Sequence, residues 1–267
     1  MPMPESAIPH TGERAPKRHV GRPTPSGAMP AFRPDRRKAP RLARALGQPL
    51  PDASSHELPR RILNVIVAGL LIVATAPIML LIAVLVKLTS PGPVIYSQTR
   101  VGLNRRAGRA ARRVTRRQDD AGGLPFTMYK FRTMRTDAEA GTGAVWASNE
   151  DARVTRIGKV LRQFRLDELP QLFNVLNGDM NLVGSRPERP TTSKDLRQQI
   201  PDYEKRQFAR PGITGWAQVN QSYDTSLDDV KRKVRFDHEY IQRRGLAEDL
   251  KIMLRTVPVI LFRRGGW

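Results

Sequence analysis

A nearly unbroken apolar run from Ile62 to Leu88, ILNVIVAGLLIVATAPIMLLIAVLVKL, limits the folds open to this chain more than any other feature. Its one charged residue, Lys87, lies near the end of the run. As a straight helix the run would extend about 40 Å, which exceeds the ~30 Å hydrocarbon core of a bilayer. A single transmembrane anchor is therefore one interpretation, whereas a buried core helix fits this length less well.

Two features favour a re-entrant hairpin, in which the chain enters and leaves the membrane on one side. Pro77 lies near the middle of the run and must kink or break a helix. The legs on either side, 62–76 and 78–88, would reach only about 22 Å and 17 Å. Basic residues outnumber acidic ones in residues 1–61, and the region after Lys87 is also basic. Because Lys and Arg favour the cytoplasmic side, a hairpin would keep both flanks there.

Composition restricts the partners of the chain. Its 267 residues carry a net charge of +21 and include no cysteine, which excludes disulfides, thiolate catalysis and Cys-based zinc sites. Residues 1–59 are rich in Pro and Arg without an apolar period, so we expect a disordered tail with no cleavable signal peptide. No nucleic-acid-binding signature accompanies the charge. Basic residues beside an apolar segment usually meet acidic headgroups, so anionic membrane lipid is the expected partner.

Residues that can carry chemistry concentrate between Arg162 and Arg186, in RQFRLDELPQLFNVLNGDMNLVGSR. Asp167 and Glu168 form an acidic pair, with arginines shortly before it and Arg186 after it. A carboxylate can act as a nucleophile or hold a metal ion, and guanidinium groups bind phosphate oxygens bidentately. The pattern therefore favours chemistry on a phosphate ester.

An apolar face predicts a helix directly after the acidic pair. Side chains recur with helical spacing at Leu169, Leu172, Phe173 and Leu176. Gly178 is typical of the residue that ends a helix, and Pro170 would lie in the first turn. This places Asp167 at the N-cap, where free N–H groups favour an anion. The spacing alone does not decide whether Asp167 is only a cap and the arginines only a solvated face.

Three sequence blocks resemble the bacterial sugar transferases, the monotopic phosphoglycosyl transferases. The blocks are DELPQLFNVLNGDM with the LVGSRP that follows it, PFTMYKFRTM at 125–134 and RPGITGWAQVN at 210–220. The similarity extends from about Arg60 to about Arg264. Two details depart from the family pattern. Ser185 precedes Arg186 where the family usually has proline, and Ala76-Pro77 stands where the family has a Ser-Pro pair at its helix break.

The resemblance implies a fold, a reaction and a location. The fold is α+β and mostly helical, with a re-entrant membrane helix at 60–89, a small cytoplasmic catalytic domain at 90–267 and interfacial amphipathic helices. The reaction transfers a sugar-1-phosphate from a UDP-sugar to polyprenyl (undecaprenyl) phosphate and releases UMP, through a covalent aspartyl-phosphosugar intermediate. It would initiate exopolysaccharide or other glycoconjugate assembly at the bacterial inner (cytoplasmic) membrane, with the catalytic domain on the cytoplasmic face.

The resemblance also assigns roles to residues. Asp167 would be the nucleophile and Glu168 its catalytic partner, with Mg²⁺ held by one or both carboxylates. The expected substrate- and phosphate-binding residues are Arg162, Arg186, Arg210, Lys130 and Asp237. Two other functions stay open: a catalytically inactive membrane scaffold of polysaccharide assembly, or a polybasic protein that binds lipid or nucleic acid.

Short strands are expected at Val94–Gln98 and Thr127–Phe131. Between them the family pattern has a short turn, whereas this chain carries an arginine-rich insertion at 104–123. The insertion either attracts anionic lipid or is a solvated surface segment. Trp216 lies in a Gly/Pro-containing loop, where it could stack on a base, line the membrane interface or simply pack.

Four further helices are predicted. They comprise the second half of Arg153–Leu166, a polar surface helix at Asp195–Arg206, and helices at Leu227–Gln242 and Ala247–Leu261. The last of these is amphipathic and is followed by FRRGGW. It could lie in the membrane interface with Phe262 and Trp267 at headgroup depth, or pack against the catalytic domain.

Overall fold

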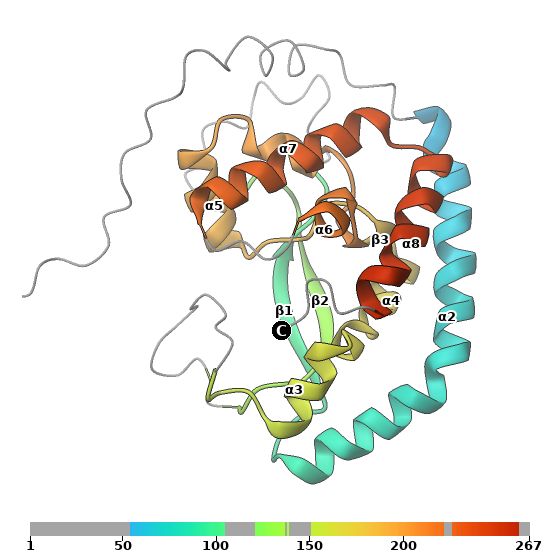
Figure 1. Ribbon diagram of the computed structural model, residues 1–267, viewed down its shortest axis with the longest axis vertical. Helices are drawn as coiled ribbons and strands as arrows, with labels where there is room; N and C mark the ends of the chain where they lie inside the picture. Colours follow the sequence, from blue (N-terminus) through green and yellow to red (C-terminus); the bar gives the residue numbers. More distant parts are fainter. Residues whose placement is uncertain (1–53, 105–120, 137, 139–150, 222–225, 262–267) are drawn as a thin grey trace, which may run out of the picture. The chain divides into compact units, whose positions relative to one another are not determined.

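A long apolar helix, a β-hairpin and a set of shorter helices form an α+β structure that is mostly helical, in agreement with the predicted fold class (Figure 1). The computed structural model describes residues 54–104, 121–136, 138, 151–221 and 226–261. The predictions for the tail before residue 54, for residues 105–120 of the insertion and for Phe262 and Trp267 lie outside these ranges.

Thirteen helices and strands follow one another along the part of the chain that the structure describes. They are α2 (Ser54–Thr89), β1 (Ile95–Val101), β2 (Pro125–Phe131), α3 (Arg156–Gln163), η2 (Leu166–Glu168), α4 (Gln171–Asn177), β3 (Asn181–Val183), α5 (Pro190–Gln199), η3 (Tyr203–Phe208), β4 (Gly212–Thr214), α6 (Trp216–Asn220), α7 (Leu227–Arg243) and α8 (Leu246–Leu261). The expected strand pair and the helices at α3, α7 and α8 are confirmed to within a few residues.

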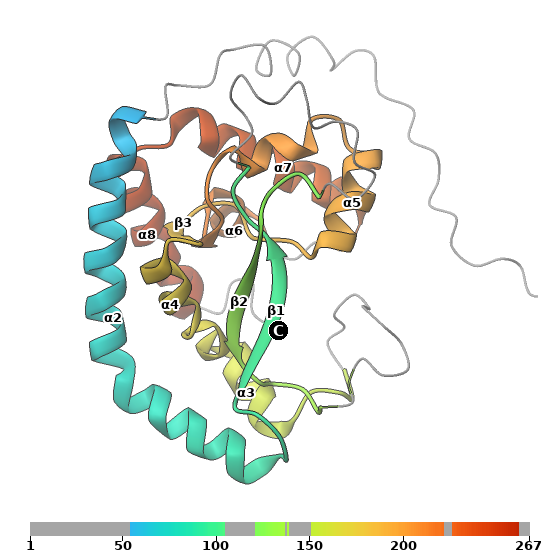
Figure 2. The same ribbon diagram turned by 180° about the vertical axis from the view of Figure 1, so that it is seen from behind.

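α2 contains the apolar run and is one helix of 36 residues, which begins earlier than the predicted boundary at residue 60. Pro77 lies inside it, and the helix bends along its length rather than breaking into two (Figures 1 and 2). Within the described ranges, one segment, Glu57–Thr89, is by length and composition long and apolar enough to cross a membrane. Its exposed apolar side chains include Leu70, Val73 and Leu80.

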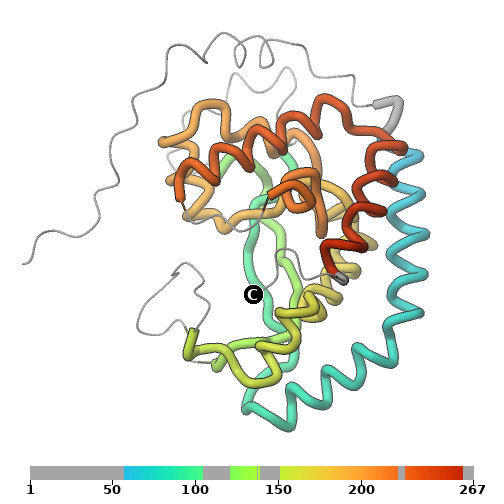
Figure 3. Tube along the Cα trace, viewed as in Figure 1, coloured from blue at the N-terminus to red at the C-terminus, as the bar shows by residue number. Residues whose placement is uncertain are grey.

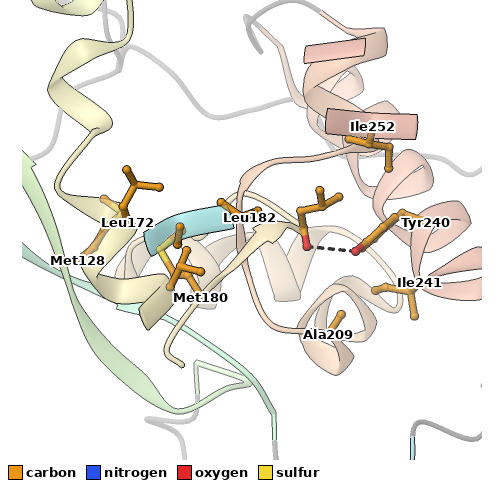
Figure 4. Close-up of a cluster of buried hydrophobic side chains, with 11 residues drawn as sticks. Met128, Leu172, Met180, Leu182, Ala209, Tyr240, Ile241 and Ile252 are labelled. Carbon is orange, nitrogen blue, oxygen red and sulfur yellow. Dashed lines mark hydrogen bonds between the residues drawn. The ribbon is translucent and has the colours of Figure 1, made fainter. Parts of the chain in front are cut away.

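Both halves of α2 pack on the rest of the protein. Ala68, in the first half, belongs to the main core, whereas Ile82 and Val86, in the second half, pack with Phe131 and Leu161. The main core joins β2, α4, β3, α7 and α8. Figure 4 shows its side chains Met128, Leu172, Met180, Leu182, Ala209, Tyr240, Ile241 and Ile252. The hydroxyl of Tyr240 also donates to the Val183 carbonyl at 3.0 Å.

A buried polar cluster fixes the start of α2 against α7 and α8. The Arg60 side chain is 1% exposed. Its Nε donates to Asp249 Oδ2 at 2.7 Å and its Nη2 donates to the Tyr240 hydroxyl at 2.6 Å. α8 runs beside the first half of α2 in the trace (Figure 3). Because a buried charge is tolerated only with good partners, this cluster ties α2 to one place on the domain.

Two small sheets organise the remaining chain. β1 and β2 pair antiparallel, from Ile95 opposite Phe131 to Val101 opposite Pro125. β3 and β4, which the sequence did not predict, pair in parallel. A Cβ at Gly212 would collide with the backbone of Gly184, so glycine permits this close approach. The pair joins the sequence block that contains the acidic pair to the block at 210–220.

The predicted surface helix at Asp195–Arg206 is right only for its first part, up to Gln199, and wrong beyond it. α5 begins at Pro190 and ends at Gln199, because Ile200 precedes Pro201 and adopts the extended conformation that such residues favour. Asp202 is left-handed, with φ 61, and η3 follows it. Trp216 was also misplaced, since it opens helix α6 rather than lying in a loop.

The buried face of α4 also differs from the prediction. Leu172 is buried, but Phe173 is 43% exposed, and the polar Gln171 and Asn174 are buried instead. Asn174 joins α4 to β2: its Nδ2 donates to the Thr127 carbonyl at 2.7 Å, and its Oδ1 accepts from the Tyr129 amide at 3.1 Å. The burial of Asn174 therefore follows its hydrogen bonds rather than hydropathy.

Candidate active site

The acidic pair lies in a tight turn between α3 and α4. Asp167 and Glu168 belong to the 3-10 helix η2, and each is 7% exposed. Arg165, just before it, adopts a left-handed conformation with φ 54. Asp167 is not the N-cap of α4, contrary to the prediction, because α4 begins at Gln171 after Pro170. Asp167 lies inside η2 instead, and Pro170 occupies the N-cap position of α4, where it makes no side-chain hydrogen bond.

Two cations from other elements meet the acidic turn. Lys130 on β2 places Nζ 2.9 Å from Glu168 Oε1 and 3.9 Å from Asp167 Oδ2. Arg186, in the loop after β3, donates from Nη2 to Glu168 Oε1 at 2.6 Å. Three segments distant in sequence, β2, η2 and this loop, thus build one cluster of two carboxylates and two cations. The structure brings together four of the residues that the sequence singled out.

The two carboxyl groups differ electrostatically. Burial raises the pKa of Asp167, and the charge of neighbouring Glu168 raises it further, against the opposing effect of Lys130. Burial also acts to raise the pKa of Glu168, but Arg186 and Lys130 outweigh it and hold that pKa well below its usual range. Glu168 is therefore ionised and binds both cations, whereas the ionised form of Asp167 is less stable than that of Glu168.

Arg162 lies at the edge of this cluster. It stands in the last turn of α3, and its Nε donates to Thr133 Oγ1 at 3.0 Å. Its positive charge lowers the pKa of Asp167, which indicates that it is close enough to act on the carboxylate without an ion pair. The position suits an arginine that meets a phosphate group beside Asp167.

Asp237 does not join the acidic turn. It is 2% exposed and accepts from Arg206 Nε at 3.0 Å. Arg206, itself 3% exposed, donates from Nη1 to the Tyr203 hydroxyl at 2.7 Å and from Nη2 to the Arg186 carbonyl at 2.9 Å. Asp237 therefore acts behind the site, on the backbone that carries Arg186. Sequence reasoning missed Arg206, because η3 was predicted to be a surface helix.

Arg210 is likewise placed away from the pair. Its Nε donates to the Gly178 carbonyl at 3.0 Å, and its Nη1 pairs with Glu57 Oε2 at 3.2 Å. Arg61 of α2 donates to the Val175 and Leu176 carbonyls nearby. These bonds satisfy the C-terminal end of α4 and connect it to α2. In this structure Arg210 stabilises the C-terminal end of α4, the helix that follows the acidic turn.

The acidic pair carries carboxylate oxygens, which are ligands of the kind that magnesium sites use. Within the described ranges no three His, Cys, Asp or Glu side chains form a metal-binding group. Mg²⁺ is commonly held by one or two carboxylates, with water and substrate phosphates as the other ligands. Asp167 is the better candidate of the two, since Glu168 already accepts from Lys130 and Arg186.

Comparison with known proteins connects this geometry to a family. Residues 55–263 match the family model described as bacterial sugar transferase. The chain is 42% identical over 202 residues to a UDP-N-acetylgalactosamine-undecaprenyl-phosphate N-acetylgalactosaminephosphotransferase of Aeromonas hydrophila, over 76% of this chain and 43% of that protein. It is 42% identical over 217 residues to a UDP-glucose:undecaprenyl-phosphate glucose-1-phosphate transferase of Caulobacter vibrioides, over 80% and 74%.

A protein of Escherichia coli with the same name as the Caulobacter one is 37% identical over 209 residues, 78% of this chain and 41% of that protein. The chain thus spans less than half of the Aeromonas and Escherichia proteins and about three quarters of the Caulobacter protein. All three matches include most of the described residues.

Proposed function

The chain belongs to the bacterial sugar transferase family, and from that premise we propose that it transfers a sugar-1-phosphate from a UDP-sugar to undecaprenyl phosphate and releases UMP. The names of its relatives support this reaction, and they differ in the sugar, which is N-acetylgalactosamine in one case and glucose in others. The observation that carries the proposal is the buried Asp167-Glu168 turn with Lys130 and Arg186 beside it. The product would begin a polysaccharide or other glycoconjugate.

Asp167 is the nucleophile of the proposed mechanism. Its carboxylate attacks the β-phosphorus of the UDP-sugar, the bond from that phosphorus to the bridging oxygen breaks, and UMP leaves. A phosphate oxygen of the lipid acceptor then attacks the same phosphorus, which frees the carboxylate and forms the lipid diphosphate sugar. Splitting the transfer into two displacements lets a soluble donor and a lipid acceptor use one site in turn. Burial, which raises the pKa of Asp167, also leaves its ionised oxygens reactive.

Glu168 organises the positive charge around the reaction. Lys130 and Arg186 are both held on its carboxylate, so they stand ready where charge develops on the phosphoryl oxygens. Arg162, whose charge acts on Asp167, would bind a further phosphate oxygen. Bound Mg²⁺, held by Asp167, Glu168 or both, would neutralise part of the diphosphate charge. Asp237 and Arg210 serve instead as positioning residues.

We further propose that α2 is re-entrant and that the catalytic domain lies on the cytoplasmic face of the inner membrane. A straight helix of 36 residues would be about 54 Å long and would end on opposite sides of a bilayer. Here Arg60 near one end and Val86 near the other both pack on the same domain. The bend and the basic flanks support the same topology.

α8 is a second candidate for membrane contact. Its exposed apolar residues include Leu250, Leu254 and Val257, and the cations Lys251 and Arg255 lie over the Trp216 ring. An amphipathic helix with this arrangement suits an interface with anionic lipid.

The direct test of the reaction is UMP release by the purified full chain in detergent. Undecaprenyl phosphate, Mg²⁺ and either UDP-glucose or UDP-N-acetylgalactosamine would be supplied. We expect acceptor-dependent UMP release with at least one donor from a broader panel of UDP-sugars. A folded protein that releases no UMP with any donor would instead support the inactive scaffold.

A further inference from the structure

An apolar groove runs between α2, the β-hairpin and the start of α4. Its volume is about 610 Å³, within the usual range of small-ligand sites. Ala76 and Ala83 of α2 contribute to one wall, and Tyr129, Phe131 and Phe173 contribute to the others. Phe173 is 43% exposed, an unusual state for an aromatic ring on a helix that is otherwise packed into the core.

The groove reaches the segment that carries the acidic turn, because Pro170, which lines it, follows Asp167 by three positions. Tyr129 and Phe131 line the groove from the face of β2 opposite to Lys130, since successive strand residues point to opposite faces. The other wall is the apolar helix α2, where the lining residue Leu80 is exposed. One end of the groove thus lies at the proline that follows the acidic turn, while its wall belongs to the candidate membrane helix.

We propose that this groove binds the prenyl chain of the lipid phosphate acceptor, starting at the isoprene unit next to its phosphate. The inference rests on the proposed function, which requires that phosphate to reach Asp167. The chain attached to it must leave the site through apolar surroundings, since exposing it to water is unfavourable. The groove provides such a path from the acidic turn to the face of α2. Small side chains at Ala76 and Ala83 leave room for a branched chain, and three aromatic rings face it.

The proposal makes Ala76 a determinant of acceptor affinity. Ala76→Leu places a larger side chain in the groove, whereas Ala74→Leu makes the same change at an exposed position of α2 that does not line it. Both variants keep a good helix former. The assay would vary the surface concentration of undecaprenyl phosphate in mixed micelles. Ala76→Leu should raise the KM for the acceptor on the order of tenfold, because the larger side chain displaces one or two methylene groups of the prenyl chain from the groove. Ala74→Leu should leave that KM unchanged.

UMP release without acceptor separates this proposal from the proposed function. A single turnover with UDP-sugar alone needs no lipid, so Ala76→Leu and Ala74→Leu should release the same amount of UMP. If the unsubstituted protein releases none, the proposed function fails. If UMP release is normal but Ala76→Leu does not change the acceptor KM, the groove is not the acceptor site and the further inference fails.

A photoreactive prenyl phosphate provides a readout that does not depend on any variant. With the unsubstituted protein, cross-links should map to peptides that contain Phe131 and Phe173, and undecaprenyl phosphate should prevent them. A straight-chain alkyl phosphate of equal length should compete at least tenfold less well. An unbranched chain would lose roughly one methylene contact in a groove that fits a branched chain. Equal competition by the alkyl phosphate, or cross-links confined to the outer face of α2 near Val73, would overturn the proposal.

Discussion

Asp237→Asn tests whether the buried network behind Arg186 positions that arginine. Asn preserves the size of the side chain and one accepting oxygen, but it removes the charge that faces Arg206. A hydrogen bond to a charged group contributes about 1.5–3 kcal/mol. Burial raises the pKa of the Asp237 carboxyl even against Arg206, but the substitution also leaves the buried Arg206 guanidinium without the carboxylate that lies 2.8 Å from it, which is destabilising. We therefore expect a loss of about 2 kcal/mol in the free energy of unfolding, at the low end of that range.

The loss is measurable by thermal unfolding in detergent. For a domain of this size, about 2 kcal/mol lowers the Tm by roughly 4–8 °C. Asp228→Asn is the matched control, since Asp228 lies on the same helix, α7, with an exposed side chain that pairs with Lys231 at 2.8 Å. A surface ion pair of this kind contributes about 0.2–1 kcal/mol, so the control should shift the Tm by less than about 4 °C.

The catalytic effect should distinguish positioning from direct binding. Because Arg206 holds the Arg186 carbonyl, Asp237→Asn should raise the KM for the UDP-sugar and lower kcat, by a factor of several each. If Asp237 faced the diphosphate directly, removing its negative charge would strengthen donor binding and lower that KM. A variant with normal Tm and a lowered KM would therefore refute the placement of Asp237 behind the site.

Three further outcomes follow from the structure. Single cysteines at Ser55 and Ser97, in a chain that has none, should resist an impermeant thiol reagent in intact cells and react after lysis; labelling of Ser55→Cys from outside would show a spanning helix. Replacing residues 105–120 by Asn-Gly should preserve UMP release in detergent, whereas extending the deletion through Ala121 should destabilise the protein, because the Ala121 carbonyl accepts from Ser193 and Gln207. Burial lowers the pKa of His238 to about 4, so the unfolded chain binds a proton first as the pH falls below its ordinary pKa of about 6.5. The Tm should therefore fall as the pH is lowered through the range between those two values, and it should fall less steeply in His238→Gln. Equal slopes of Tm against pH in the two proteins would contradict this.

Local signals predicted the parts of the fold that depend on local causes. Gly178 ends α4 in the left-handed conformation expected of a helix-terminating glycine, with φ 85. The strands around Lys130 and the helices α7 and α8 lie where alternation and helical spacing placed them. The bend of α2 likewise follows from a proline within an apolar run.

The errors have non-local causes. The buried face of α4 is set by Asn174, which bonds to β2 across 45 positions of sequence, and no hydropathy pattern encodes that bond. β3 and β4 are each three residues long and pair only because Gly212 approaches Gly184 closely. Asp167 belongs to the separate turn η2 rather than to the start of α4, a boundary that counting apolar positions does not locate.

The site was predicted in part. Asp167, Glu168, Lys130 and Arg186 belong to sequence blocks that the family resemblance identified, and they meet in space. Resemblance could not distinguish a residue that touches substrate from one that supports it. Asp237 and Arg206 are charged residues on segments that the sequence presents as polar surface, and their burial depends on how α7 and η3 pack.

The most direct test of the mechanism is intact-protein mass spectrometry of Asp167→Asn after incubation with a UDP-sugar donor and Mg²⁺ but no acceptor. The unsubstituted protein should gain the mass of one phosphosugar, and the variant should gain none and lose turnover by several orders of magnitude. Because burial raises the pKa of Asp167, a neutral amide there should leave the Tm unchanged or higher. Asp195→Asn, at an exposed position of α5, should form the adduct normally. An Asp167→Asn protein that turns over at the normal rate, or that still gains the phosphosugar, would contradict the assignment of Asp167 as the nucleophile.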